Sequence, residues 1–82
     1  MSNFRINQNY NSDMNLHEIG KLIKERRESL NLRQEDLSEL STINTRTIHL
    51  IEQGTANPSF ETLKKISEVL GLEVLLKIKQ IN

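Results

Sequence analysis

The sequence predicts an all-α domain of four to five helices that ends in a single β-strand. Three observations lead to this fold class. Residues 33–54 hold two short amphipathic segments joined by a tight turn. Longer amphipathic segments, at about 15–30 and 59–71, flank this pair. After residue 71 the apolar spacing changes from three or four residues to two, which indicates a strand.

Length and composition limit the class of protein. The chain has 82 residues, of which 35% are hydrophobic and 27% are charged, so it has the composition of one globular domain with a modest core. No apolar run approaches the roughly 20 residues of a membrane-spanning helix, and the N-terminus lacks an apolar signal core. The chain has no cysteine and only two, widely separated histidines, so we expect no metal and no cofactor.

The first 30 residues divide into a tail and a helix. Residues 1–13 are polar and show no apolar period, so we predict a flexible tail; an arm that reaches a groove or a partner is the alternative. Asn15 and Glu18 have the spacing of a capping box, and they begin a helix that runs to about Leu30. Asn31 suits the left-handed position after it. The predicted buried stripe is Leu16, Ile19, Ile23 and Leu30.

The next two helices are short. The second spans about Gln34 to Leu40, and the third spans about Thr45 to Gln53 with Asn44 as its N-cap. Gly54 closes the third helix. Apolar residues recur at a three-residue spacing on both helices and in the turn, and they predict a core face made of Leu37, Leu40, Ile43, Ile48 and Ile51.

A fourth helix follows a loop. Ser59 is its predicted N-cap, and Gly71 is its predicted end. The apolar face is made of Phe60, Leu63, Ile66, Val69 and Leu70. Together these elements predict a compact domain over residues 14–71.

Residues 72–82 are predicted to form a dimerisation strand and the chain end. The apolar side of the alternation is Leu72, Val74, Leu76 and Ile78. A single strand in a helical chain leaves its backbone donors and acceptors unpaired unless another molecule supplies a strand. The simplest partner is the same strand of a second copy, antiparallel across a two-fold axis. The alternative is that residues 72–79 continue as loop or helix.

The third helix carries the candidate binding residues. With Ile48 and Ile51 inward, Thr45, Arg46 and His49 face solvent on a helix that fits the major groove of DNA. The formal net charge of zero argues mildly against nucleic acid, but residues 44–50 hold a cation and no acid. The acidic residues suit solvated helix faces better than an acid–base site; they are Glu25, Glu28, Glu35, Asp36 and Glu39. No phosphate loop or nucleophile motif is present, so we expect a non-enzyme.

Over about Leu16–Leu72 the chain resembles the Cro/cI-type helix-turn-helix family, also called the XRE family, whose members have a lambda-repressor-like DNA-binding domain. The match rests on residues in the family's order and spacing: Ile23, Arg27, Leu32, Gln34, Glu35, Leu37, Ile43, Thr47, Ile48, Ile51, Glu52, Gly54, Asn57, Pro58, Ser59 and Leu63. The ending at residues 70–79 is similar to the C-terminal strand of HipB-type antitoxins, two of which pair in a dimer.

The resemblance implies roles for individual residues. It places Arg27 and Glu52 in a buried ion pair between the first and third helices. The implied base-reading residues are Thr45, Arg46, His49 and Leu50. The implied phosphate contacts are Arg33, Gln34, Asn44, Thr47 and Asn57. The chain departs from the family pattern at three positions: Thr42 stands for the usual turn Gly, Arg33 for a Ser or Thr cap, and Leu50 for a polar side chain.

The function implied is a sequence-specific, homodimeric repressor that binds a palindromic operator in the cytoplasm, at the nucleoid. The ending further implies the HipB-like antitoxin of a type II toxin–antitoxin pair, which represses its own operon and binds a HipA-like kinase toxin. Two alternatives stay open. One is a protein-interaction module that holds a toxin or enzyme inactive. The other is a phage-type or restriction-modification controller, although these tend to end in a helix.

Overall fold

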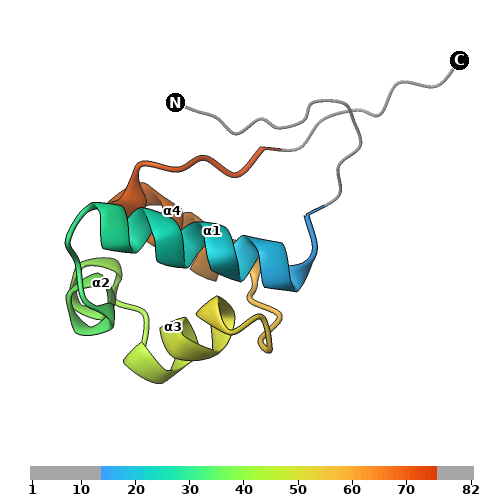
Figure 1. Cartoon of the computed structure of the whole chain (residues 1–82), viewed down its shortest axis with the longest axis horizontal. Helices are drawn as coiled ribbons and strands as arrows, with labels where there is room; N and C mark the ends of the chain where they lie inside the picture. The colour runs from blue at the N-terminus through green and yellow to red at the C-terminus, as the bar shows by residue number, and fades with distance from the viewer. Residues whose placement is uncertain (1–13, 76–82) are drawn as a thin grey trace, which may run out of the picture.

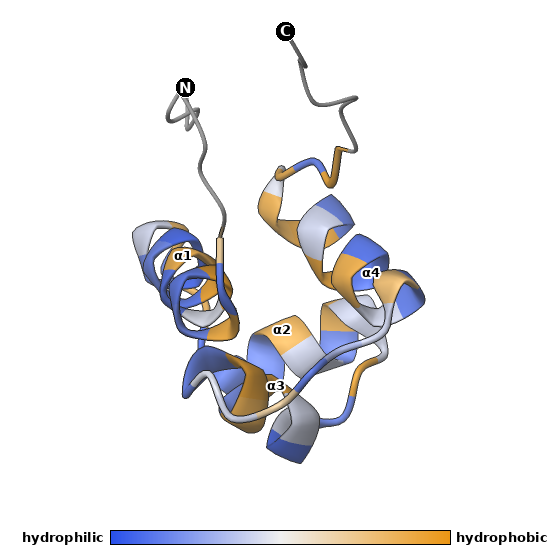
Figure 2. Ribbon diagram, turned by 90° about the vertical axis from the view of Figure 1, so that its right-hand side faces the viewer, coloured by the Kyte–Doolittle hydropathy of each residue, from blue (hydrophilic) through white to orange (hydrophobic). Residues whose placement is uncertain are grey.

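Four helices make up residues 14–75, the part of the chain that the computed structural model describes. They are α1 (Leu16–Ser29), α2 (Gln34–Ser41), α3 (Thr45–Glu52) and α4 (Phe60–Leu70). α1 crosses the molecule in front of α4, with α2 and α3 below (Figure 1). Seen from the side, α1 and α4 form two flanks above α2 and α3 (Figure 2). The predicted flexible tail, residues 1–13, lies outside the described residues.

The ends of the helices follow the predicted local chemistry. The Asn15 side chain accepts a hydrogen bond from the Glu18 backbone N–H at 2.9 Å, and the Glu18 carboxylate accepts one from the Asn15 N–H at 3.2 Å. Ser59 caps α4 by accepting from the Thr62 N–H at 3.1 Å. Asn31 and Gly71 take the left-handed conformation, with φ of 60° and 71°. These caps satisfy backbone groups that have no partner inside a helix.

One apolar cluster joins the four helices. Its fully buried members are Ile23, Leu37, Ile48, Ile51, Ile66 and Leu70. Ile43, in the turn between α2 and α3, packs against this cluster from the side. The helical spacing of the apolar residues therefore predicted the centre of the core.

The edges of the core differ from the prediction. Leu16, Leu30, Leu40 and Phe60 are 36, 39, 61 and 60% exposed. Three of these four lie at or just beyond a helix end, where neighbouring elements cover only one side. On α2 the small Ser41, four residues after Leu37, is buried in place of Leu40. A spacing of four residues is closer to a whole helical turn than a spacing of three, so Ser41 faces the core more directly.

The strand prediction is wrong for residues 72–75, which form no strand. The Leu72 N–H donates to the Ser67 carbonyl oxygen at 2.9 Å, so the chain folds back onto the end of α4. Leu72 then packs against the core, while Val74 and Leu75 are exposed. The apolar side chain of Leu72 therefore covers the end of a helix and leaves no extended edge for pairing. Leu76 and Ile78, also assigned to the strand, lie outside the described residues.

α4 is tied to α1 at its C-terminal end. Arg26 Nε donates to the Leu70 carbonyl oxygen at 2.7 Å, so a cation sits where the helix dipole is negative. None of the four helices of residues 14–75 has the length and apolar character that crossing a membrane requires.

Candidate nucleic-acid interface

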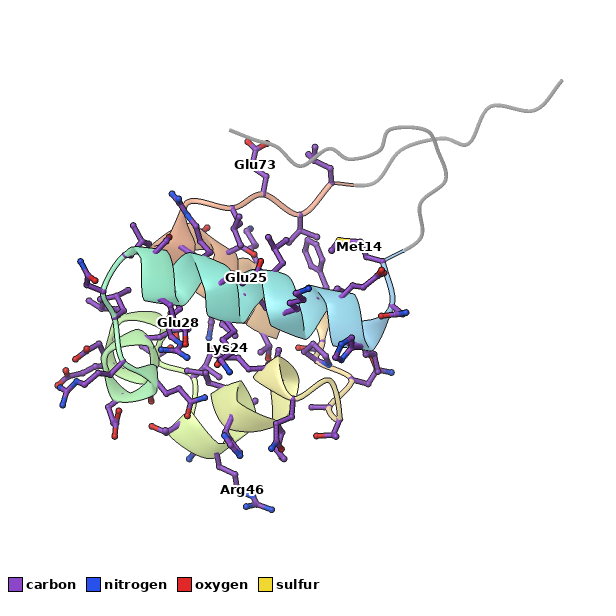
Figure 3. The ribbon with its side chains drawn as sticks, viewed as in Figure 1. Met14, Lys24, Glu25, Glu28, Arg46 and Glu73 are labelled. Carbon is purple, nitrogen blue, oxygen red and sulfur yellow. The ribbon has the colours of Figure 1, made fainter. Side chains whose placement is uncertain are left out.

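α3 is held by two buried side chains and presents the opposite face to solvent. Ile48 and Ile51 are 0 and 1% exposed, whereas Arg46 and His49 are exposed. Figure 3 shows Arg46 projecting from the lower edge of the molecule, away from α1. Because the two isoleucines lock the rotation of the helix, the direction of Arg46 is determined by the core.

Gly20 lets α1 approach the C-terminal end of α3 very closely. A Cβ at this position would overlap the carbonyl oxygen of Ile51 and would lie 2.9 Å from the carbonyl oxygen of Glu52. Only glycine allows this contact between two backbones. The sequence analysis did not single out Gly20; the available signal was a glycine inside an otherwise regular apolar stripe.

Arg27 and Glu52 form the ion pair that the family resemblance implies. Arg27 Nε lies 2.7 Å from Glu52 Oε2, and Arg27 Nη2 donates to Glu52 Oε1 at 2.9 Å. Arg27 Nη1 also donates to the Leu32 carbonyl oxygen at 2.8 Å. The hydrogen bond from Glu52 raises the pKa of the Arg27 guanidinium. The two side chains are 9 and 3% exposed, so this bidentate pair joins α1 to α3 inside the protein.

Gln34 belongs to the same network. Its side-chain Nε2 donates to Glu52 Oε1 at 3.0 Å. The sequence analysis assigned Gln34 to a phosphate contact and missed this hydrogen bond, for which an 18-residue separation offers no local signal. The amide keeps a second N–H and its carbonyl oxygen, so one hydrogen bond to Glu52 leaves polar groups for a further contact.

Arg33, the N-cap of α2, is bound to its own helix. Its backbone N–H donates to Asp36 Oδ2 at 2.8 Å, and its guanidinium Nη2 donates to Asp36 Oδ1 at 3.0 Å. The Arg33 hydrogen bonds lower the pKa of the Asp36 carboxyl. Asp36 therefore supplies the carboxylate that caps this helix, where the usual Ser or Thr is absent.

The turn before α3 is built from three polar side chains. Thr42 takes a left-handed φ of 63°, the conformation for which its β-branched side chain is poorly suited. The Ser41 hydroxyl accepts from the Ile43 N–H at 3.2 Å. Asn44 accepts from the Arg46 N–H at 2.7 Å, so its side-chain oxygen is used as the N-cap of α3. The turn thus keeps its place in the chain although Thr42 replaces glycine.

The remaining candidate residues surround the exposed face of α3. Thr45, Thr47 and Leu50 are half-buried, and Asn57 is exposed in the loop before α4. Arg46 is the only residue of α3 with a cationic Lys or Arg side chain, and the single acid of α3, Glu52, is turned inward toward Arg27. This face therefore offers donors, acceptors and one cation with no opposing carboxylate, which suits contact with base edges and phosphates.

Comparisons with known proteins agree with this geometry. The family described as helix-turn-helix matches residues 23–76, well over half of the chain. A proposed HTH-type transcriptional regulatory protein of Methanococcus vannielii is 44% identical over 63 residues, which cover 77% of this chain and 18% of that protein. A similarly described protein of Methanothermobacter thermautotrophicus is 36% identical over 63 residues, or 77% of this chain and 20% of that protein. The chain thus spans about a fifth of the length of these relatives.

A solved structure is similar in fold. The restriction-modification controller protein C.AhdI from Aeromonas hydrophila superposes with a TM-score of 0.68 at 29% sequence identity, and the match covers 71% of this chain and 88% of that chain. The predicted resemblance to the Cro/cI type is therefore confirmed at the level of the family. The chain belongs to the helix-turn-helix family of DNA-binding transcriptional regulators.

Proposed function

We propose that this chain is a sequence-specific repressor whose α3 enters the major groove of operator DNA. The observation that carries the proposal is the orientation of α3. Its apolar residues are fully buried, and Arg46 projects outward from a helix fixed by the core and by the Arg27–Glu52 pair. A helix presented rigidly in this way can bring side chains to base edges without losing much freedom on binding.

The proposed contacts divide by chemistry. Arg46 suits a guanine, His49 and Thr45 can exchange hydrogen bonds with base edges, and Leu50 can contact a thymine methyl group. The positioning contacts to phosphate are Arg33, Gln34, Asn44, Thr47 and Asn57. For Arg33, moving to phosphate means exchanging Asp36 for a DNA oxygen, since the guanidinium is bound to Asp36 in the free protein.

A controller-type regulator is the better supported class. The similarity to the restriction-modification controller C.AhdI favours it. The HipB-like antitoxin with a HipA-like toxin partner rested on a strand at residues 72–79, and residues 72–75 form none. The objection that controllers do not end in a strand therefore loses its basis for this part of the chain. We propose a homodimer that acts in the cytoplasm on a palindromic site, with half-sites about 34 Å apart.

The test begins with DNA selection. The full chain is used to enrich binding sites from a random-sequence duplex library, and the affinity for the selected site is then measured by fluorescence anisotropy. Arg46→Ala is expected to weaken binding by about 1–3 kcal/mol and to relax the preference at one base position. Lys65→Ala on α4 is the control, because this exposed cation lies on another helix, beside Glu61.

Two results would contradict the proposal. The first is a library in which no sequence is enriched. The second is an Arg46→Ala variant with the affinity and base preference of the wild type. Either result would favour the protein-interaction module, in which the exposed face of α3 contacts a protein.

A further inference from the structure

We infer that two copies of this chain associate through a groove between α4 and residues 72–75, called here the α4 groove. The groove has a volume of about 230 Å³. Phe60 and Lys64 line it from α4, and Leu72, Val74 and Leu75 line it from the segment that folds back along the helix. This inference rests on the proposed function, since a repressor of a palindromic site needs a surface that joins two copies.

The α4 groove carries most of the poorly covered apolar surface on this flank. Phe60 is 60% exposed, Leu75 is 72% exposed and Val74 is 37% exposed. Large apolar side chains gathered beside one hollow mark an interaction site more often than single ones do. Leu40, which is 61% exposed, is not part of the groove and offers a comparison on α2.

The charges around the α4 groove favour a second copy as the occupant. Lys64 and Glu68 lie one turn apart on α4, and Glu73 lies on the other wall. A two-fold interface presents the same residues twice, so Lys64 of one copy meets a carboxylate of the other, and the reverse contact forms as well. A strongly basic or strongly acidic partner would be opposed by one of these signs.

The position of the groove is compatible with DNA binding. α4 packs against α1 and α2, and α3 packs against the same two helices from below. Figure 2 shows α4 as one flank of the molecule with α3 at its base. A second copy joined at this flank leaves both α3 helices free. Side chains of the groove thus take the joining role that the sequence analysis gave to paired strands.

Sedimentation velocity of the full chain over a range of concentrations tests the inference. Wild type is expected to sediment as a dimer at high concentration. Phe60→Ser is expected to raise the dimer dissociation constant at least about tenfold, the effect of losing a central apolar anchor. Leu40→Ser is the matched control and is expected to leave it unchanged. Circular dichroism of each variant shows whether the helices are retained.

A charge exchange sharpens the test, because it does not depend on a core residue. Lys64→Glu alone places like charges across the two-fold axis and is expected to weaken the dimer. Combining it with Glu68→Lys, or with Glu73→Lys, restores opposite charges and is expected to recover association. Recovery by a second charge reversal occurs only if the residues face each other in the dimer.

Several results would overturn the inference. They are a chain that stays monomeric at every concentration, a dimer that none of the groove variants weakens, and an effect of Leu40→Ser equal to that of Phe60→Ser. A monomer that still binds one selected half-site in an Arg46-dependent manner would remove the α4 groove and leave the proposed function intact. A groove-dependent dimer that selects no DNA would do the opposite.

Discussion

The Gln34 side-chain nitrogen donates a hydrogen bond to Glu52 Oε1 at 3.0 Å and so joins the first residue of α2 to the last residue of α3. The same carboxylate accepts two hydrogen bonds from Arg27 of α1. One buried side chain therefore connects the three helices that position the candidate DNA-binding face. The orientation of α3 depends on this network as well as on the apolar core.

Gln34→Met is predicted to lower the free energy of unfolding by about 1–2 kcal/mol. The variant keeps the length of the side chain and removes one donor to a buried carboxylate, a bond worth more than one between neutral groups. Thermal and urea unfolding measure the loss. Gln53→Met is the control, since Gln53 is exposed just after α3. Equal stability of the two variants would show that the Gln34 hydrogen bond contributes nothing.

Gly20→Ala is predicted to destabilise the protein by about 2 kcal/mol, the typical effect of overpacking. Helix propensity alone predicts the opposite sign, because Ala is favoured over Gly inside a helix by about 1 kcal/mol. The added Cβ meets the backbone carbonyls of Ile51 and Glu52, which cannot turn aside as a side chain can. Urea unfolding distinguishes the two signs. Lys21→Ala, at the next and exposed position, is the control and is expected to change stability by less than about 0.5 kcal/mol.

Thr42→Gly is predicted to raise the free energy of unfolding by about 0.5–1 kcal/mol. A left-handed φ costs a residue with a Cβ about 1–2 kcal/mol, and the greater freedom of glycine in the unfolded chain offsets part of the gain. Thermal unfolding is the measurement. The comparison is Asn31→Gly, at a φ of 60°, where the gain is expected to be smaller because Asn tolerates this conformation. A loss of stability in Thr42→Gly would mean that the threonine side chain stabilises the turn.

Asp36→Asn is predicted to reduce stability at neutral pH and to match the wild type in acid. The pKa of Asp36 is lower in the folded protein than its ordinary value, because the carboxylate accepts hydrogen bonds from Arg33. Its stabilising contribution is therefore present above the ordinary carboxyl pKa and is lost as the pH falls through the lower, folded value. Unfolding curves recorded from about pH 7 down to about pH 2 should converge. A constant difference between the two proteins would assign the effect to another cause.

The helix boundaries were predictable because they depend on neighbours in the chain. Asn15 caps α1, Asn44 caps α3 and Ser59 caps α4, each by a hydrogen bond to a residue two or three positions ahead. Such bonds form between residues that the sequence already places together. Much of the core was predictable for the same reason, since Ile48 and Ile51 must share a face once α3 is helical.

The errors occurred where a distant element decides the outcome. Leu40 has the right spacing for the core, but the way α2 packs buries Ser41 instead. The alternation at residues 72–75 predicted a strand, but Gly71 turns the chain back over α4 and Leu72 covers the end of that helix. In both cases the apolar pattern was present, and the packing of a different helix determined which residue used it.

The sequence alone determined the four helices, their caps and the outward stripe on α3, because hydrogen bonds and periodicity within about four residues specify them. Only the tertiary structure decided the shared role of Arg27, Gln34 and Glu52, the backbone contact at Gly20, and the α4 groove. These features join residues that lie far apart in the chain. A sequence pattern shows which groups need partners, whereas packing selects the partners that they find.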